Sequence, residues 1–329
     1  MQNKKVLITG GAGFIGSHTA EEFLNNGYKV KILDNLRTGD LQNLTHIKDR
    51  ISFIQGDIRD AELVTSLIDD STAVVHLAAL VSVPESIENP SLAHDINVTG
   101  MHTVLNESRL SSAVCFISAS SAAIYGSSVP VPTPESITHA PSSPYGLHKS
   151  INEQYGKLFA ELHGMQVTFL RFFNVYGPRQ KAEGGYASVI PAFIKKVRAN
   201  EPALINGSGT ISRDFIHVRD VARALYLAVE HASTQVEGFT ESPESEEVKR
   251  DDNDAGANFN VYNIATGKPT SLDTLWNTIC KVSNKNIQVT YGEKRAGDIE
   301  VSIADVSKAN KELKFEARVS LEDGLREIV

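Results

Sequence analysis

Two side chains in the segment PYGLHK have types and a spacing that could move a proton. They are Tyr145 and Lys149, four residues apart, and at that spacing they share one face of a helix. A tyrosine has a pKa of about 10 and is a poor base at neutral pH, but a neighbouring ammonium lowers that pKa. The pair alone is also typical of an exposed tyrosine beside a solvated lysine, so the rest of the chain has to decide.

The segment SSPYGLHKSINEQYGKLFAELHG predicts a helix that carries this pair near its start. Ser143 suits the N-cap, Pro144 the first helical position and Gly164 the stop. Four apolar residues recur at helical spacing and are expected to pack on a sheet: Leu147, Ile151, Leu158 and Leu162. Tyr145 and Lys149 would then share a face that lies off this apolar stripe.

A glycine array follows the first strand-like run, in TGGAGFIGSH. Gly10, Gly13 and Gly16 stand three apart between a strand pattern and a helix pattern. Such glycines permit a tight turn and bring backbone N–H groups and a helix N-terminus close to a pyrophosphate. The second strand ends in Asp34, whose carboxylate can bind an adenosine ribose and would repel a 2′-phosphate. This favours NAD over NADP, with the nearby Arg37 as the opposing signal.

Other strand ends are expected to meet the same cofactor. Asp57, in GDI, could meet the adenine amino group, and HLAA at 76–79 would pass under the cofactor. The run 113–118 leads into SASSAAIYG, which offers hydroxyl groups near the Tyr–Lys pair. A serine, a tyrosine and a lysine beside a nicotinamide would form a proton-transfer set, in which the lysine and the positive ring lower the tyrosine pKa.

The elements that must position these residues follow from hydrophobic patterning. Strands that are apolar on both faces are predicted at 5–9, 29–34, 51–55, 73–78, 113–118 and 166–171. Helical patterns, such as 15–25 and 92–108, lie between them. This alternation predicts an α/β fold with a doubly wound parallel sheet, a Rossmann fold. Its NAD-binding domain is expected mainly over 1–173.

The second half predicts a smaller mixed α/β part that binds the substrate, mainly over 174–329, with some segments returning to the Rossmann domain. Helices are predicted at 189–200, 220–230 and 272–283, the last capped by Ser271, and a strand is predicted at 260–265. Residues 233–258 hold eight acidic and two basic residues with almost no apolar periodicity. They predict a mobile surface insertion.

Composition argues against several classes of protein. The chain has 329 residues and a net charge of −8, which argues against a nucleic-acid or membrane-surface partner. Cys115 and Cys280 lack the spacing of metal ligands and predict buried thiols without a metal. The N-terminus enters a strand at once, and no apolar run is long enough to span a bilayer. The cytoplasm is the expected compartment.

Taken in order, these motifs resemble those of the extended short-chain dehydrogenase/reductases, and more narrowly of the UDP-sugar C4 epimerases. The resemblance runs from TGGAGFIGSH through FFNVYGPRQ (172–180), SRDFIHVRDV (212–221) and RAGD (295–298), nearly the whole chain. It implies that the catalytic residues are Ser121, Tyr145 and Lys149. It also implies a homodimer joined by a four-helix bundle of segments 92–108 and 144–162.

The resemblance completes the set of expected binding residues. For the cofactor they are Gly10, Gly13, Phe14, Ile15, Gly16, Asp34, Asn35, Asp57, Ile58, Leu77, Ala78, Ala79, Asn97, Tyr145, Lys149 and Phe172. For the UDP-sugar they are Ser121, Tyr145, Asn174, Ser188, Val189, Leu204, Asn206, Arg213, Arg295, Asp298 and Ser302. Arginines suit this task because the guanidinium offers paired donors to phosphate oxygens. Taken alone, Arg213 could equally form a salt bridge with Asp214 or Asp220.

The implied reaction inverts C4 of the sugar. Tyr145, as phenolate, would take the proton of the C4 hydroxyl while Ser121 binds the same oxygen. The C4 hydride would pass to NAD and return to the other face of a transient 4-keto sugar. Related 4,6-dehydratases carry an acidic pair directly after the catalytic hydroxyl residue, where this chain has Ala122 and Ala123. That difference argues against a dehydratase.

Several questions of specificity stay open at this stage. Ser302 stands where related epimerases carry a tyrosine that blocks N-acetyl sugars, so plain and N-acetylated hexoses could both fit, although Ser302 could also be an ordinary strand residue. A UDP-glucuronate 4-epimerase is an alternative, because Lys181 or His148 could face a carboxylate. A non-catalytic sensor of NAD or nucleotide sugar is another, although it would need none of the three catalytic residues.

Overall fold

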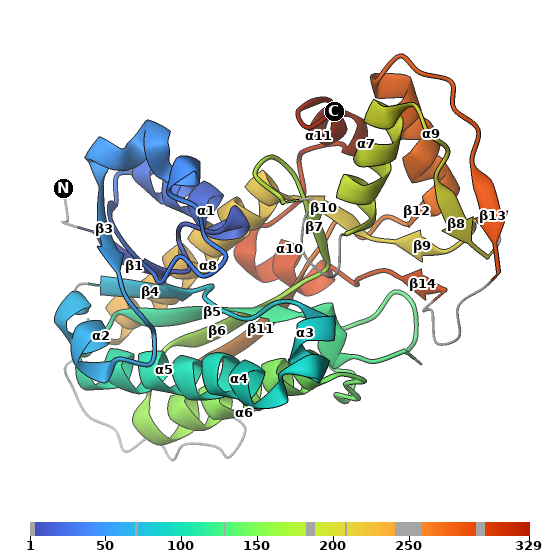
Figure 1. Ribbon diagram of the computed structural model, residues 1–329. Coiled ribbons are helices and arrows are strands. Elements are labelled where there is room, and N and C mark those ends of the chain that lie inside the picture. The colour runs from blue at the N-terminus through green and yellow to red at the C-terminus, as the bar shows by residue number, and fades with distance from the viewer. Residues whose placement is uncertain are drawn as a thin grey trace.

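The computed structural model describes residues 4–69, 72–127, 129–181, 188–207, 209–240, 258–293 and 300–329. At its centre lies a seven-stranded parallel sheet with the strand order β11-β6-β5-β4-β1-β2-β3 (Figure 1). The strands are β1 (Lys5–Thr9), β2 (Lys29–Asp34), β3 (Ile51–Gln55), β4 (Thr72–His76), β5 (Cys115–Ser121), β6 (Val167–Phe172) and β11 (Phe259–Ile264). The predicted doubly wound sheet is confirmed.

Helices cover both faces of this sheet (Figure 1). One face carries α1 (Phe14–Asn25), the 3-10 helix η1 (Leu41–Arg50) and α8 (Val218–Thr240); the other carries α2 (Ala61–Leu67), α5 (Met101–Leu110) and α6 (Pro144–His163). Phe23 and Tyr262 are buried in the first layer, and Phe116 and Phe169 in the second. Both faces of the sheet are therefore dry, which explains why its strands are apolar throughout.

The strand order reverses between β1 and β4. From β1 the chain winds one way to β2 and β3, and from β4 it winds the other way to β5, β6 and β11. Ligands of such sheets bind in the crevice at this reversal, outside the carboxyl ends of the strands. Strand β5 runs on to Ser121, past the predicted end at 118, so that it carries a serine to this edge.

The second half of the chain adds a smaller mixed part, at the upper right of Figure 1. Its elements are β7 (Asn174–Tyr176), α7 (Val189–Ala199), β8 (Leu204–Asn206), β9 (Ser212–Arg213), β10 (Phe215–His217), β12 (Thr270–Ser271), α9 (Leu272–Val282), β13 (Thr290–Gly292), β14 (Val301–Ser302) and α11 (Leu321–Arg326). Trp276 and Phe193 meet edge to face in its core, with ring centroids 5.3 Å apart. In contrast, β11, α8 and α10 (Ser307–Leu313) return to the large sheet and its first layer.

Helix α6 has the predicted ends but not the predicted orientation. Ser143 accepts a hydrogen bond from Gly146 N as the N-cap, and Gly164 ends the helix in the left-handed conformation. The apolar stripe faces outward: Leu147 and Leu158 are each 49% exposed and Leu162 is 72% exposed. The prediction that this stripe packs on the sheet is therefore wrong.

Small and polar residues form the face of α6 that meets the sheet. A Cβ added to Gly156 would lie 2.3 Å from Phe169, which shows how closely α6 approaches β6. Lys149 and Glu153 are buried on this face. Helix α6 thus buries the side chains that hydrogen-bond to the strands rather than its most apolar ones. As a result, Tyr145 and Lys149 point toward the sheet edge.

The predicted helix over 92–108 is a helical run with a wider turn in its middle. Helix α4 (Pro90–His94) passes into a π-helical turn, η2 (Asp95–Gly100), and then into α5. Such turns are frequent at functional sites because they redirect one side chain. Here the turn carries the buried Asn97.

The segment 233–258, predicted to be a mobile insertion, begins in a helix. Helix α8 continues to Thr240, so the first part of that segment is helical. The remainder, 241–257, lies outside the described residues. Among the residues that are described, no helix is both long and apolar enough to cross a membrane.

Candidate active site

The glycine loop between β1 and α1 is shaped by close backbone contacts. Gly10 has φ +71°, and a Cβ there would lie 2.7 Å from Ala78 N in the loop after β4. A Cβ on Gly16 would lie 2.2 Å from Gly10 O. Gly13 is the N-cap of α1, and no side chain of the described residues caps this helix. The loop therefore leaves backbone N–H groups for an anion such as a pyrophosphate.

Asp34, at the end of β2, organises the two loops beside it. Its carboxylate accepts hydrogen bonds from Ala12 N (3.0 Å) and Leu36 N (2.8 Å). Burial raises the pKa of Asp34, and these two hydrogen bonds oppose that rise. Arg37, the opposing signal in the sequence, forms an ion pair with Glu85 of α3 (Val83–Glu88). Its charge is therefore partly neutralised, which weakens the case for a 2′-phosphate here.

Asp57 is held by its own neighbours. Arg59 donates two hydrogen bonds of 2.8 Å to the carboxylate, and Asn35 donates one of 3.1 Å. The Arg59 guanidinium holds the pKa of Asp57 well below its usual range. The next residue, Ile58, is buried against Gly100, where a Cβ would lie 2.6 Å from it. The adenine contact expected of Asp57 stays a prediction.

The loop after β4 is anchored from both sides. Thr9 Oγ1 accepts hydrogen bonds from Leu77 N (3.2 Å) and Ala78 N (3.3 Å). Asn97 holds the far end of the loop, because its side chain accepts from Leu80 N (2.7 Å) and donates to Leu80 O (2.9 Å). These bonds keep the loop beside Gly10. They also occupy the Asn97 side chain with backbone, so its cofactor contact stays a prediction.

The three predicted catalytic residues lie together at the end of β5. Lys149 Nζ donates a 2.7 Å hydrogen bond to Ala119 O and lies 5.8 Å from the centre of the Tyr145 ring. Ser121 Oγ accepts from Ala123 N (3.2 Å) and hydrogen-bonds Tyr145. The sequence therefore identified a group of side chains that the fold brings into contact.

The electrostatics of this group differ from the expectation. Burial raises the pKa of Tyr145, and only the hydrogen bond with Ser121 acts against that rise. Burial lowers the pKa of Lys149 to about 8, and the charge of Glu153 opposes that fall. The protein's own groups alone therefore do not make Tyr145 acidic. A further positive charge beside the phenol would be needed to stabilise the phenolate.

The start of α6 is fixed by contacts with two short helices. Tyr145 N donates to Ser86 Oγ of α3 (3.3 Å). A Cβ on Gly146 would lie 2.6 Å from Ala123 O in the 3-10 helix η3 (Ala122–Ile124), so the two backbones touch. These contacts set the position of the phenol relative to Ser121.

His148 and Lys181, the residues considered for binding a carboxylate, have other neighbours. His148 is buried, and its ring meets that of His94 at 5.5 Å. Lys181 donates to Thr38 O (3.1 Å) and lies 3.8 Å from Asp40, both in the loop after β2. No observation therefore favours a uronate site at either residue.

Two of the predicted substrate residues are strand neighbours. Arg213 of β9 and Ser302 of β14 are paired in the parallel register of these strands. Asn174 donates to Asp214 O through its backbone N (3.1 Å) and its Nδ2 (3.2 Å). The fold thus gathers three candidates from distant parts of the sequence.

Asp214 is the buried centre of this region. Its carboxylate accepts hydrogen bonds from Thr266 N (2.8 Å), Thr266 Oγ1 (2.6 Å), Gly267 N (2.9 Å) and Ala304 N (3.3 Å). Burial raises its pKa, and these bonds oppose the rise. Asp220 likewise accepts from the backbone N of Arg318 and Val319. Both acids thus have backbone partners of their own.

The remaining candidates are distributed over several other parts of the chain. Ser188 is the exposed N-cap residue of α7, next to the half-buried Val189. Leu204 is exposed on β8, in the same strand as Asn206. Phe172 is buried at the end of β6. Arg295 and Asp298 lie outside the described residues.

Sequence reasoning missed five residues that organise the site: Thr9, Ser86, Glu153, Arg171 and Asp214. Two of them carried a signal. Glu153 is an acid one turn after Lys149 on the same helix, and Arg171 is a charge in a strand that is otherwise apolar apart from Thr168. A charge in such a buried strand requires a partner.

Comparison with known proteins gives one consistent relationship. The family model described as GDP-mannose 4,6 dehydratase matches residues 7–328. The UDP-glucose 4-epimerase of Bacillus subtilis is 30% identical over 97% of this chain and 94% of its own.

Solved structures agree. The UDP-N-acetylglucosamine 4-epimerase of Methanobrevibacter ruminantium M1, in complex with UDP-N-acetylmuramic acid, is 34% identical with a TM-score of 0.86 and covers 99% of this chain and 97% of its own. The UDP-glucose 4-epimerase of Stenotrophomonas maltophila, with bound NAD and formylated UDP-arabinopyranose, is 29% identical with a TM-score of 0.87 and covers 98% and 96%.

We expect Tyr145 to titrate above its ordinary pKa of about 10 in protein freed of any dinucleotide, because burial disfavours the phenolate. The measurement is the phenolate absorbance across pH, taken as the difference between the native protein and Tyr145→Phe. Tyr155→Phe, which removes an exposed tyrosine of the same helix, controls for the subtraction. A midpoint below that of free tyrosine would show that Lys149 alone makes the phenol acidic.

Proposed function

This chain belongs to the UDP-sugar 4-epimerase family of the extended short-chain dehydrogenase/reductases, and we propose that it interconverts the C4 epimers of a UDP-hexose with NAD as its cofactor. The observation that carries the proposal is the grouping of Ser121, Tyr145 and Lys149 at the end of β5. A protein that only sensed NAD or nucleotide sugar would need none of these three contacts.

The residues around the glycine loop fit NAD. The space that a Cβ would fill at Gly10 and Gly16 is occupied by backbone, so the turn is as tight as a pyrophosphate cradle requires. The Asp34 carboxylate at the end of β2 suits a ribose with free hydroxyls. When bound, NAD would supply the redox chemistry, as the acceptor and then the donor of the C4 hydride.

The chain's own side chains perform the proton chemistry. Tyr145, as phenolate, takes the proton of the C4 hydroxyl and later returns it. Ser121 hydrogen-bonds the same hydroxyl oxygen and holds it near the phenol. Lys149, fixed to Ala119 O, keeps a positive charge beside the ring while its ammonium is protonated. As the pH rises through about 8, the pKa of Lys149, that charge is lost, and with it the part that Lys149 adds to the stabilisation of the phenolate.

The family model is described as a dehydratase, but the site favours epimerisation. Elimination of water needs a carboxylate next to the reacting carbon, and the two positions after Ser121 are Ala122 and Ala123 in η3. Neither side chain can transfer a proton. The ketone formed at C4 is therefore expected to be reduced again rather than dehydrated.

The sugar specificity that we propose includes N-acetylated hexoses. Ser302 is small and lies next to Arg213 in the paired strands β14 and β9. By the resemblance, Ser302 stands in place of the tyrosine that blocks N-acetyl sugars in related epimerases, and its small size would leave room at C2. The relative from Methanobrevibacter ruminantium M1, described as a UDP-N-acetylglucosamine 4-epimerase, supports this range.

We also propose that the protein is a homodimer joined through α5 and α6. The apolar stripe of α6, with Leu147, Leu158 and Leu162, faces away from the sheet, and Leu110 of α5 is also exposed. Tyr155 and Phe159 of α6 pack against His102 of α5, so the two helices form one surface. A second copy would cover this apolar face and remove it from water. The cytoplasm stays the expected compartment.

We expect proton NMR to show the C4 epimer forming from UDP-glucose and from UDP-N-acetylglucosamine in separate tubes, with little change of UDP-glucuronate. Tyr145→Phe should slow conversion by about a hundredfold to ten-thousandfold, because it removes the proton-transfer group. Tyr155→Phe should leave the rate unchanged. No conversion of any of the three by native protein with NAD bound would favour the sensor alternative.

We expect Ser302→Tyr to slow conversion of UDP-N-acetylglucosamine by about tenfold or more while UDP-glucose is still converted, because the larger side chain fills the space beside C2. Val301→Tyr is the matched control, since neighbouring strand residues point to opposite faces. Equal losses for both substrates with Ser302→Tyr would contradict the assignment of Ser302 to specificity.

We expect size-exclusion chromatography with light scattering to give a dimer for the native protein and a monomer for Leu158→Glu, because a charge in the apolar face disfavours its burial. Leu41→Glu changes a similarly exposed leucine on η1 and should leave the dimer intact. A native protein that is monomeric at all concentrations would refute this assembly.

A further inference from the structure

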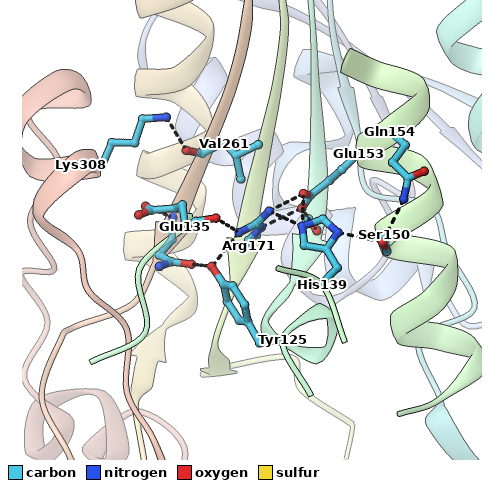
Figure 2. Close-up of polar contacts among 11 residues, drawn as sticks. Tyr125, Glu135, His139, Ser150, Glu153, Gln154, Arg171, Val261 and Lys308 are labelled. Carbon is cyan, nitrogen blue, oxygen red and sulfur yellow. Dashed lines mark hydrogen bonds and ion pairs between the residues drawn. The ribbon is translucent and has the colours of Figure 1, made fainter. Parts of the chain in front are cut away.

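A buried ion pair lies one helical turn beyond Lys149. Glu153 of α6 and Arg171 of β6 are bonded twice, Nε to Oε1 at 3.0 Å and Nη2 to Oε2 at 2.6 Å (Figure 2). Each side chain is only 4% exposed. Two charges taken so far from water require a complete set of partners, because an unpaired buried charge is costly.

Those partners are present. Ser120 Oγ donates a 2.5 Å hydrogen bond to Glu153 Oε1. The other Arg171 donors reach Tyr125 Oη (2.9 Å), Glu135 O (2.8 Å) and His139 Nε2 (2.7 Å), as Figure 2 shows. Since every N–H of the guanidinium has an acceptor, Arg171 is a fixed anchor. Glu153 is therefore held in one position from two strands.

Glu153 adds a third contact between α6 and β5. Tyr145, Lys149 and Glu153 follow one another at intervals of four residues along the helix. They contact three consecutive positions of the strand: Tyr145 meets Ser121, Lys149 meets Ala119 and Glu153 meets Ser120. A shift of the helix along the strand would break all three contacts at once.

We propose that Glu153, anchored by Arg171 and Ser120, is a positioning residue that holds Lys149 against β5 and keeps its ammonium charged during catalysis. This inference rests on the proposed function only where it assigns Lys149 its role beside Tyr145. Glu153 itself touches neither the sugar nor the cofactor in this assignment.

The charges around Lys149 support this role. On β4, His76 is buried, and burial together with the Lys149 charge lowers its pKa to about 3, so it is neutral at physiological pH. On α6, the neighbouring His148 has its pKa lowered by burial, by His94 of α4 and by Lys149. Arg171 of β6 is ion-paired with Glu153, and of the two only Glu153 shifts the pKa of Lys149. Glu153 is the group that raises the pKa of Lys149 against burial.

The sign of the effect follows. Burial alone favours the neutral amine, and the Glu153 carboxylate favours the ammonium. Removing that carboxylate moves the pKa of Lys149 further below its present value of about 8. More of the lysine is then neutral near neutral pH, so the alkaline limb of the rate profile moves to lower pH.

The test measures Lys149 directly. In protein labelled at lysine Cε and saturated with NAD, the Cε chemical shift is followed across pH for native protein and Glu153→Gln, with Lys149→Arg identifying the resonance. The expected result is a midpoint lower by about one pH unit in Glu153→Gln, the size expected for charges one helical turn apart. Glu153→Asp, which keeps the charge, should restore most of the midpoint. Glu161→Gln, two turns further along α6, should leave it unchanged.

A second variant keeps the test open if Glu153→Gln does not fold, since that change leaves the Arg171 charge buried without its partner. Glu153→Gln combined with Arg171→Met removes both charges and should lower the midpoint in the same direction. A Lys149 midpoint equal to that of native protein in whichever variant folds overturns the proposal, even if turnover is lost. Conversely, suppose that native protein converts no UDP-sugar while the variant still lowers the Lys149 midpoint. That result overturns the proposed function and leaves the inference about Lys149 in place.

Discussion

The position of α6 against the sheet depends on burying polar and charged side chains rather than apolar ones. Lys149 is hydrogen-bonded to Ala119 O and Glu153 is paired with Arg171, because a charged side chain removed from water needs a partner. Leaving either charge without its partner would cost several kcal/mol. These two partners fix the position of α6 along the strands. The phenol of Tyr145 reaches Ser121 as a consequence.

Two other buried carboxylates organise the regions on either side. Asp34 holds the turns that follow β1 and β2 through Ala12 N and Leu36 N. Asp214 ties β9 to the segment at Thr266 and to Ala304 beside β14. Both use backbone N–H groups as partners, which fixes loops without the need for a second charged side chain. The dinucleotide side and the sugar side of the proposed site are thus each organised by a buried carboxylate that accepts backbone hydrogen bonds.

Much of this fold follows from local signals in the sequence. Strands β1, β2 and β3 begin and end at the predicted residues, because a short apolar run bounded by polar residues is typical of a buried strand. Ser143 and Ser271 are N-caps as expected, since a hydroxyl there satisfies N–H groups of the first turn. The glycine loop could also be predicted, because only glycine avoids a clash at positions 10 and 16. Local signals could not show which face of a helix packs on the sheet. The Glu153–Arg171 bond joins a helix to a strand far away in the sequence, and with Glu153 facing the sheet Leu158 faces outward.

Helix α3 contacts two distant parts of the proposed site, the loop after β2 and the start of α6. It is only six residues long, and a helix of that length has no stability of its own in water. Its neighbouring residues Glu85 and Ser86 hold Arg37 in the loop after β2 and Tyr145 at the start of α6. A local unfolding event that detaches α3 would therefore loosen both places in a single step. The two ends of the site belong to one cooperative unit, although they lie more than a hundred residues apart in the chain.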